Sequence, residues 1–195
     1  MSDISAFILV GGASSRMGRD KARLEISGKD FVERCAAVLS KIAQSVSTVG
    51  SHYEEDVWQI PNVPDKYVKW GALGGLHAAL SACQTDWALV VACDLPFVTE
   101  ELFKRLASLR ESHDAVVPIQ SDGRRQPLCA FYRTAICLTT AEDLILAGKR
   151  RPLDLLEKIN TRFVEPPEWS DLTNAGHFFN NINTPQDYER MKDEE

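Results

Sequence analysis

Short apolar runs alternate along the chain with longer stretches in which apolar residues recur every three or four positions. The first run, Ala6–Val10, is wholly apolar and stops at a pair of glycines, as a strand buried on both faces of a parallel sheet does. Trp87–Ala92 and Ala115–Pro118 are similar runs, and Val46–Val49 is a weaker one. We therefore expect a strand at each of these places.

The stretches between these runs have the spacing of amphipathic helices. Apolar residues recur at intervals of three and four over Val32–Ala43 and over Gly75–Cys83. Ala135–Ala147 and Pro152–Ile159 also indicate helices, and the first of these is followed by Gly148, a residue type that favours helix ends. Strands and helices thus follow each other in the order βαβαβ over the first half of the chain.

Two more helices are indicated by the residues that begin them. Thr99 precedes two glutamates, which supplies a side-chain cap and negative charge at the positive end of the helix dipole. Near the end of the chain, Thr184 is followed by Pro185 and, three residues after the threonine, by Asp187, a combination typical of a helix start. We expect a C-terminal helix there.

One part of the pattern favours an antiparallel pair. The turn-forming residues Ser121-Asp122-Gly123 lie between Val116–Ile119 and Pro127–Tyr132, so a hairpin-like excursion is expected. No repeat and no Gly/Ser-rich linker divides the chain. The pattern therefore predicts one α/β domain over residues 1–195, with a mainly parallel sheet and a small antiparallel excursion.

Composition agrees with a folded globular chain and excludes several function classes. Of the 195 residues, 44% are hydrophobic and 26% charged, with a formal net charge of −6, the wrong sign for coating nucleic acid. The longest apolar run, Trp87–Cys93, is far shorter than the roughly 20 residues that span a bilayer. The start of the chain lacks the features of a signal peptide, so we expect no membrane or nucleic-acid partner and a cytoplasmic location. The five cysteines have no C-x-x-C spacing and are expected to be reduced.

The densest chemical signal is the glycine-rich stretch that follows the first strand. Gly11 and Gly12 let backbone N–H groups approach an anion, two serines add donors, and Arg16 and Lys21 add positive charge, which together suit a phosphate. The P-loop pattern fails because Gly18 follows Gly12 by six positions and precedes Arg19. The dinucleotide pattern fails because Ala13 stands where its second glycine is needed. The alternative is an ordinary strand-to-loop connection with solvated charges.

A second candidate lies at the end of the clearest strand. Asp94 lies just past the end of Trp87–Ala92, after Cys93. This is the place where open α/β sheets bind ligands. A carboxylate there can hold Mg²⁺, which takes one or two protein carboxylates together with substrate phosphates. The alternative is a turn in which Asp94 bonds to nearby backbone. Cys93 is next to it, but no histidine is close in sequence to activate that thiol.

Three weaker features leave both a functional and a structural interpretation open. Gly71–Leu76 reads as a glycine-rich loop entering a helix, able to bring backbone donors to a base or phosphate. Asn180–Asn183 offers amides that either complete a ligand shell or close a turn. The four histidines have no metal-ligand spacing, and ordinary structural positions are expected for them.

Taken in series, these motifs carry a family resemblance. They read Leu9-Val10-Gly11-Gly12-x-Ser14-x-Arg16-Met17-Gly18-x-Asp20-Lys21, Gly71-Ala72-Leu73-Gly74-Gly75-Leu76, Cys93-Asp94-Leu95-Pro96 and Asn181-Ile182-Asn183-Thr184-Pro185-x-Asp187. In order and spacing the chain resembles the molybdenum cofactor guanylyltransferase family. The resemblance implies a three-layer α/β/α fold of the nucleotide-diphospho-sugar transferase type, which is Rossmann-like. It also implies transfer of GMP from GTP to molybdopterin with release of pyrophosphate, and Mg²⁺ as the metal.

The resemblance also implies roles for individual residues. Asp94 would bind Mg²⁺ and act with Arg16 and Lys21 on the phosphates, and Asp65 matches an acidic family position that contacts GTP. The full set expected to bind ligands is Leu9, Val10, Gly11, Gly12, Lys21, Asp65, Asp94, Asn181 and Asn183. The resemblance also implies that other proteins of cofactor biosynthesis hand over molybdopterin.

Departures from the family pattern concern the nucleotide base. Val10 replaces the usual Ala, Ala72 replaces the usual Pro, and Val49-Gly50-Ser51 lacks the amide that guanylyl-transferring relatives tend to carry. One alternative is therefore a nucleotidyltransferase that uses CTP with molybdopterin, or an NTP with a sugar phosphate. Another is a non-catalytic nucleotide-binding module, against which the joint presence of Lys21, Asp94 and an asparagine pair argues.

Overall fold

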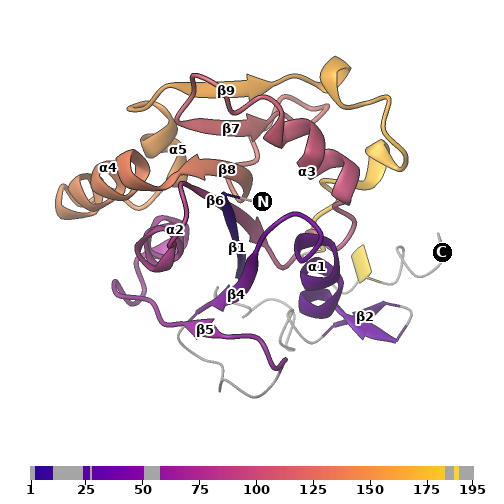
Figure 1. The fold of residues 1–195 in the computed structure, drawn as a ribbon, viewed down its shortest axis with the longest axis horizontal. Helices are drawn as coiled ribbons and strands as arrows, with labels where there is room; N and C mark the ends of the chain where they lie inside the picture. The colour runs from indigo at the N-terminus through magenta and orange to yellow at the C-terminus, as the bar shows by residue number, and fades with distance from the viewer. Residues whose placement is uncertain (1–2, 11–23, 27, 51–57, 183–186, 189–195) are drawn as a thin grey trace.

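The fold is a seven-stranded sheet covered on both faces by helices, as the computed structural model shows (Figure 1). The structure describes residues 3–10, 24–26, 28–50, 58–182 and 187–188. The strands of the sheet are β1 (Ile4–Leu9), β4 (Ser45–Val49), β5 (Asn62–Val63), β6 (Trp87–Ala92), β7 (Ala115–Pro118), β8 (Cys129–Arg133) and β9 (Thr161–Val164). A separate small hairpin is formed by β2 (Glu25–Ile26) and β3 (Lys29–Asp30).

The sheet is mainly parallel, as the sequence predicts. Its strand order is β5-β4-β1-β6-β8-β7-β9. Only β8 runs against its neighbours: it pairs antiparallel with both β6 and β7, while the other described pairings in the sheet are parallel. The expected antiparallel excursion is therefore confirmed, and it returns the chain into the sheet between β6 and β7.

Helices lie in two layers, one on each face of the sheet (Figure 1). They are α1 (Phe31–Leu39), α2 (Gly71–Ala82), α3 (Glu100–Ala107), α4 (Thr134–Leu146) and α5 (Pro152–Leu156), with short 3-10 helices η3 (Pro166–Glu168) and η4 (Ala175–His177). The alternation along β1 separates the layers: Ile4, Ala6 and Ile8 pack in the core with α1 and α3, whereas Phe7 and Leu9 pack with α2, α4 and α5. A strand covered on both faces has to be apolar throughout.

Several element boundaries agree closely with the prediction. β6 and β7 have the predicted ends. The hydroxyl of Thr99 accepts a hydrogen bond from Leu102 N (3.3 Å) and caps α3. Asp30 begins α1 with a reciprocal capping box to Glu33, although this helix ends at Leu39, short of the predicted Ala43.

Other boundaries differ from the prediction. α2 begins at Gly71 rather than Gly75, and α5 ends at Leu156 rather than Ile159. β5 and β9 were not predicted, because they are short strands at the two edges of the sheet. Asp187 and Tyr188 are helical, while the predicted helix start at Thr184 lies outside the described residues.

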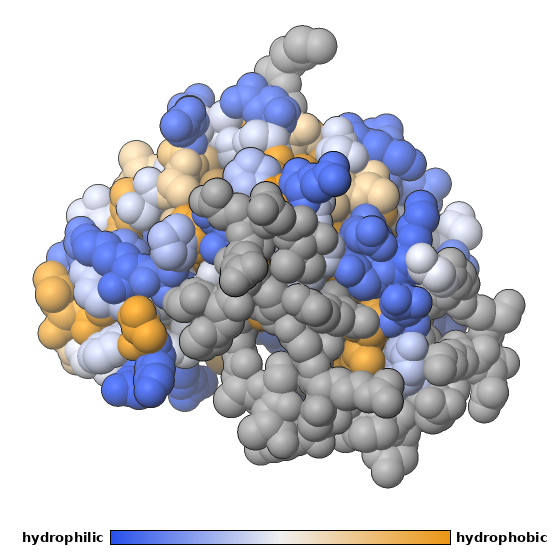
Figure 2. Space-filling view, turned by 90° about the horizontal axis from the view of Figure 1, so that it is seen from below, coloured by the Kyte–Doolittle hydropathy of each residue, from blue (hydrophilic) through white to orange (hydrophobic). Residues whose placement is uncertain are grey.

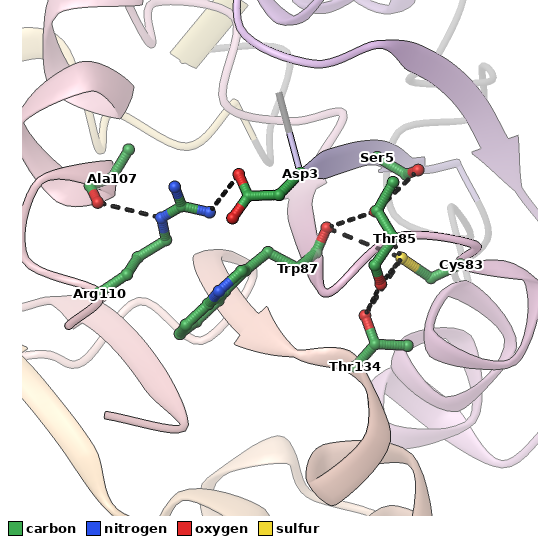
Figure 3. Close-up of polar contacts among 8 residues, drawn as sticks. All are labelled: Asp3, Ser5, Cys83, Thr85, Trp87, Ala107, Arg110 and Thr134. Carbon is green, nitrogen blue, oxygen red and sulfur yellow. Dashed lines mark hydrogen bonds and ion pairs between the residues drawn. The ribbon is translucent and has the colours of Figure 1, made fainter. Parts of the chain in front are cut away.

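Polar contacts close the amino-terminal edge of the sheet (Figure 3). The hydroxyl of Thr85 lies 3.0 Å from both Ser5 Oγ and the Trp87 carbonyl, which joins β1 to the start of β6. Thr134 Oγ1, at the start of α4, lies 2.7 Å from the Thr85 carbonyl and 3.2 Å from Cys83 Sγ. This end of the sheet is occupied by structural contacts.

On the same edge, Arg110 packs its guanidinium 5.1 Å above the Trp87 ring and forms an ion pair with Asp3 (3.1 Å) (Figure 3). Stacking of arginine on an aromatic ring is favourable. A ligand site is therefore to be sought at the opposite, carboxyl edge of the strands.

The surface of the described residues has few exposed large apolar side chains. Hydrophilic residues lie on both sides of the face in Figure 2, and a group of apolar residues lies at its left edge. Among the described residues, the large apolar side chains that are exposed are Val68, Ile136 and Leu146. Within the described part of the chain, no helix is long and apolar enough to cross a membrane.

Candidate functional site

The carboxyl ends of four neighbouring parallel strands, β5, β4, β1 and β6, form the edge at which open α/β sheets bind ligands. Backbone pairing continues one step past the strand ends. The bonds are Val10 N to Val49 O (3.0 Å), Gly50 N to Val63 O (3.1 Å) and Cys93 N to Leu9 O (3.1 Å). These hydrogen bonds hold the carboxyl ends of the strands together at one edge of the sheet.

Leu9 and Val10 lie at this edge, and their side chains are buried. The Leu9 carbonyl and the Val10 N–H are already bonded within the sheet. These two backbone groups therefore already hold the end of β1 to its neighbours.

Asp65 follows β5 by two residues and, like Leu9, lies near Gly75. A Cβ atom at Gly75, in the first turns of α2, would lie 3.7 Å from both Leu9 methyl groups and 3.9 Å from Asp65 Oδ1. Both side chains are therefore within ordinary contact distance of a Cβ at this position. The structure brings together two residues that are far apart in sequence, Leu9 and Asp65, both predicted for this site.

Asp94 leaves β6 at the same edge and is half-buried. A turn follows the strand, with Leu95 N–H donating to the Ala92 carbonyl (3.3 Å). The negative charge of Asp94 also affects the pKa of the buried Cys35 thiol. Burial first, and then this charge, raise the pKa of that thiol to about 12, so the thiol is protonated at neutral pH.

The C-terminal segment reaches the edge next to Asp94. Ile182 N–H donates to the Asp94 carbonyl (3.3 Å), and the Ile182 side chain packs with Leu24 and Phe31. Asn181, which precedes it, is exposed. A predicted asparagine and a predicted metal-binding aspartate are thus held close by one backbone bond.

The remaining predicted site residues lie outside the described residues: Gly11, Gly12, Arg16, Lys21 and Asn183. The described residues on either side of the glycine-rich stretch are well anchored. Val10 is paired at the sheet edge, and Leu24 accepts a hydrogen bond from Phe31 N (3.1 Å). The described chain resumes at Leu24, which packs with Ile182.

The expectation of a glycine loop at Gly71–Leu76 was wrong, because these residues form the first turns of α2. Gly74 is required by packing: a Cβ there would lie 2.9 Å from Trp70 Cβ and 3.0 Å from the Tyr67 carbonyl. Leu73 lies in the first turn, where backbone N–H groups have no partner within the helix. Its N–H donates to the Arg150 carbonyl (3.3 Å). The glycines serve close packing of the helix start against the turn before it.

Sequence reasoning missed a cluster beside Asp65. Glu142 of α4 accepts hydrogen bonds from Lys66 Nζ (2.9 Å) and the Tyr67 hydroxyl (3.1 Å), and His77 is buried beside them. Because these partners are about 75 residues apart in the chain, no local spacing could have indicated them.

The side chains at this edge suit magnesium, which needs few protein ligands, better than a metal ion that is held by protein side chains alone. Among the described residues, no group of three or more His, Cys, Asp or Glu side chains is arranged so that it could hold a metal ion. Mg²⁺ takes one or two carboxylates and completes its shell with phosphate oxygens and water. Asp94, half-buried just past the end of β6, is a carboxylate that fits that requirement.

Comparison with known proteins supports a common family. Residues 6–164 match the family described as MobA-like NTP transferase domain. A probable molybdenum cofactor guanylyltransferase of Pelotomaculum thermopropionicum is 33% identical over 96% of this chain and 91% of its own length. One from Bacillus cereus AH187 is 31% identical over 96% of this chain and 95% of its own length.

Solved structures agree. The molybdopterin-guanine dinucleotide biosynthesis protein A of Archaeoglobus fulgidus superposes with a TM-score of 0.81 at 26% identity and covers 97% of both chains. The 2-C-methyl-D-erythritol 4-phosphate cytidylyltransferase of Thermus thermophilus has a TM-score of 0.69 at 17% identity, with 96% of both chains covered. At that identity the second likeness concerns the fold alone.

Proposed function

Because this chain belongs to the family of MobA-like NTP transferase domains, we propose that it is a molybdenum cofactor guanylyltransferase. It transfers GMP from GTP to molybdopterin, forms the guanine dinucleotide cofactor and releases pyrophosphate. The observation that carries the proposal is the convergence of Leu9, Asp65 and Asp94 at one edge of the sheet, in a chain whose relatives of similar length have that name.

The chemistry follows from charge. The phosphate of molybdopterin is an anionic nucleophile, so its attack on the α-phosphorus of GTP needs little help from a base and mainly needs repulsion between the anions reduced. In this proposal Lys21 and Arg16 face the triphosphate, and the backbone from Leu9 to Gly12 orients it. Asp94 would hold Mg²⁺, which when bound neutralises phosphate charge.

Asp65 and the C-terminal asparagines complete the proposed assignments. In this proposal Asp65 accepts hydrogen bonds from the ribose hydroxyls or the base edge of GTP. Asn181 lies beside the Asp94 backbone, and with Asn183 it would contact the acceptor side of the site.

An assay of each NTP with molybdopterin and Mg²⁺, followed by identification of the dinucleotide product, tests this function. We expect GTP to be preferred, with a kcat/KM about tenfold or more above that of CTP, because one mismatched buried polar contact costs roughly 1–3 kcal/mol. A preference for CTP would reassign the protein as a cytidylyltransferase. Failure of every NTP to react would leave only nucleotide binding.

A further inference from the structure

One carboxylate on α4 holds two consecutive residues of the segment that carries Asp65. Glu142 Oε1 accepts from Lys66 Nζ (2.9 Å) and from the Tyr67 hydroxyl (3.1 Å). Both bonds lower the pKa of Glu142, and the lysine is their larger contributor. Glu142 therefore remains ionised and able to accept both bonds throughout the neutral range.

The segment Asp65–Tyr67 also packs against α2. The Tyr67 carbonyl lies against Gly74, and the edge of the His77 ring meets the Tyr67 ring at a centroid distance of 5.0 Å. Since Asp65 immediately precedes Lys66, the place of its carboxylate beside Gly75 depends on how firmly Lys66 and Tyr67 are held.

His77 is the buried titratable group that the proposed reaction does not use. Its side chain is 1% exposed, and neither ring nitrogen has a hydrogen-bond partner among the described residues. Nε2 lies 3.9 Å from Glu142 Oε1, the oxygen that Lys66 and Tyr67 share.

Charges around His77 act in opposite directions. Burial is the largest influence and lowers the pKa of the ring; Glu142 raises it and Lys66 lowers it. The ring is therefore neutral near pH 7. When the ring takes up a proton at lower pH, the imidazolium attracts Glu142 and repels Lys66, which weakens the contact between these two residues.

We propose that Glu142 is a positioning residue for the nucleotide site: it holds Asp65 in place through Lys66 and Tyr67, and protonation of His77 loosens that hold. The inference rests on the proposed function, in which Asp65 contacts GTP. It assigns α4, a helix that contributes none of the predicted site residues, a role in GTP affinity.

The first experiment compares Glu142→Ala with a matched control. Glu100 is also a half-buried carboxylate that holds two lysines, Lys41 (3.4 Å) and Lys104 (2.6 Å), but it belongs to α3. Glu142→Ala is expected to raise KM for GTP roughly two- to fivefold, the size of effect an exposed ion pair carries, with kcat unchanged. Glu100→Ala is expected to change neither. Equal KM values in both variants would overturn the proposal.

A double variant separates this proposal from the function on which it rests. If Glu142 acts through Asp65, Asp65→Ala combined with Glu142→Ala has the same KM for GTP as Asp65→Ala alone. Additive effects of the two substitutions would overturn the positioning role. If Asp65→Ala by itself leaves GTP binding unchanged, the assignment of Asp65 fails instead.

A pH profile tests the part of His77. The γ-phosphate of GTP titrates near pH 6, as phosphate monoesters do, so wild type is compared with His77→Phe at each pH and only the ratio of KM values is used. We expect the ratio of wild type to variant to rise as pH falls below 6.5. A ratio that stays flat down to pH 5.5 would remove His77 from the proposal. His77→Leu serves in place of His77→Phe if the larger ring prevents folding.

Discussion

At the scale of single residues, the structure distinguishes carboxylates at the carboxyl edge of the sheet from those at its amino edge. Asp94 leaves β6 at the carboxyl edge, whereas Asp86 precedes the same strand at the amino edge and is exposed. The two residues provide a matched pair for testing which end of the sheet is functional.

Asp94→Asn is expected to lower kcat by roughly a hundredfold or more, as loss of a group that stabilises charge in the transition state does, while the thermal unfolding temperature stays near that of wild type. Asp86→Asn is expected to retain full activity. Steady-state kinetics at saturating Mg²⁺ and a thermal melt of each variant check this. Near wild-type turnover of Asp94→Asn would make Asp94 only a turn residue.

Lys21→Ala is expected to raise the Kd for GTP roughly ten- to hundredfold, because a hydrogen bond to a charged group contributes about 1.5–3 kcal/mol. Isothermal titration calorimetry measures it, with Lys158→Ala as a control on an exposed lysine next to α5. Unchanged affinity in Lys21→Ala would refute the assignment of this lysine to the triphosphate.

At the scale of elements, the clearest lesson is the start of α2. Glycine lowers helix propensity, and the sequence of Gly71–Gly75 favours a loop on that ground. Contact of this helix start with the Tyr67–Trp70 turn outweighs propensity, because only glycine fits at position 74. The choice depended on how closely the helix start approaches the preceding turn, which hydrophobic pattern and helix propensity do not describe.

Gly74→Ala therefore tests the packing argument. In most helices alanine is more stabilising than glycine by about 0.5–1 kcal/mol. Here the added Cβ would overlap Trp70 Cβ and the Tyr67 carbonyl, so we expect a net loss of about 1–3 kcal/mol, or several degrees in the unfolding temperature.

Gly75→Ala is the control for this substitution, since a Cβ there meets only ordinary contacts at 3.7–3.9 Å. Chemical denaturation of both variants gives the free energies of unfolding. A Gly74→Ala protein as stable as Gly75→Ala would contradict the account of α2.

The strands show where sequence reasoning succeeds and where it stops. β6 and β7 are buried, continuous apolar runs, and their bounds were predicted correctly. β9 (Thr161–Val164) is half-exposed at the end of the sheet and has no such run. Leu9 and Asp94 could be assigned to one edge because parallel strands end together, whereas Glu142 could not, because its partners are set by the packing of α4 on α2.

At the scale of the whole molecule, folding stability depends on pH through groups whose pKa changes on folding. Burial lowers the pKa of His77 below its ordinary value near 6.5, so the folded protein binds fewer protons than the unfolded chain just below that pH. Stability is then full above pH 6.5 and falls as pH drops toward the lower pKa of the folded state.

We expect the free energy of unfolding of wild type to decrease between pH 7 and pH 5.5, with His77 contributing a slope of at most about 1.4 kcal/mol per pH unit. His77→Phe should show a shallower decrease. Urea denaturation at a series of pH values measures both proteins. Parallel profiles would mean that His77 titrates alike in the folded and unfolded states.

The position of β8 has a consequence for synthesis of the chain. β6 and β7 are adjacent in sequence order but not in the sheet, because β8 lies between them. Until Cys129–Arg133 has left the ribosome, each of these two apolar strands has an open edge that its final partner cannot yet cover. Open edges of this kind recruit other chains, so a stalled or truncated product ending before residue 129 would be prone to aggregate and would depend on chaperones.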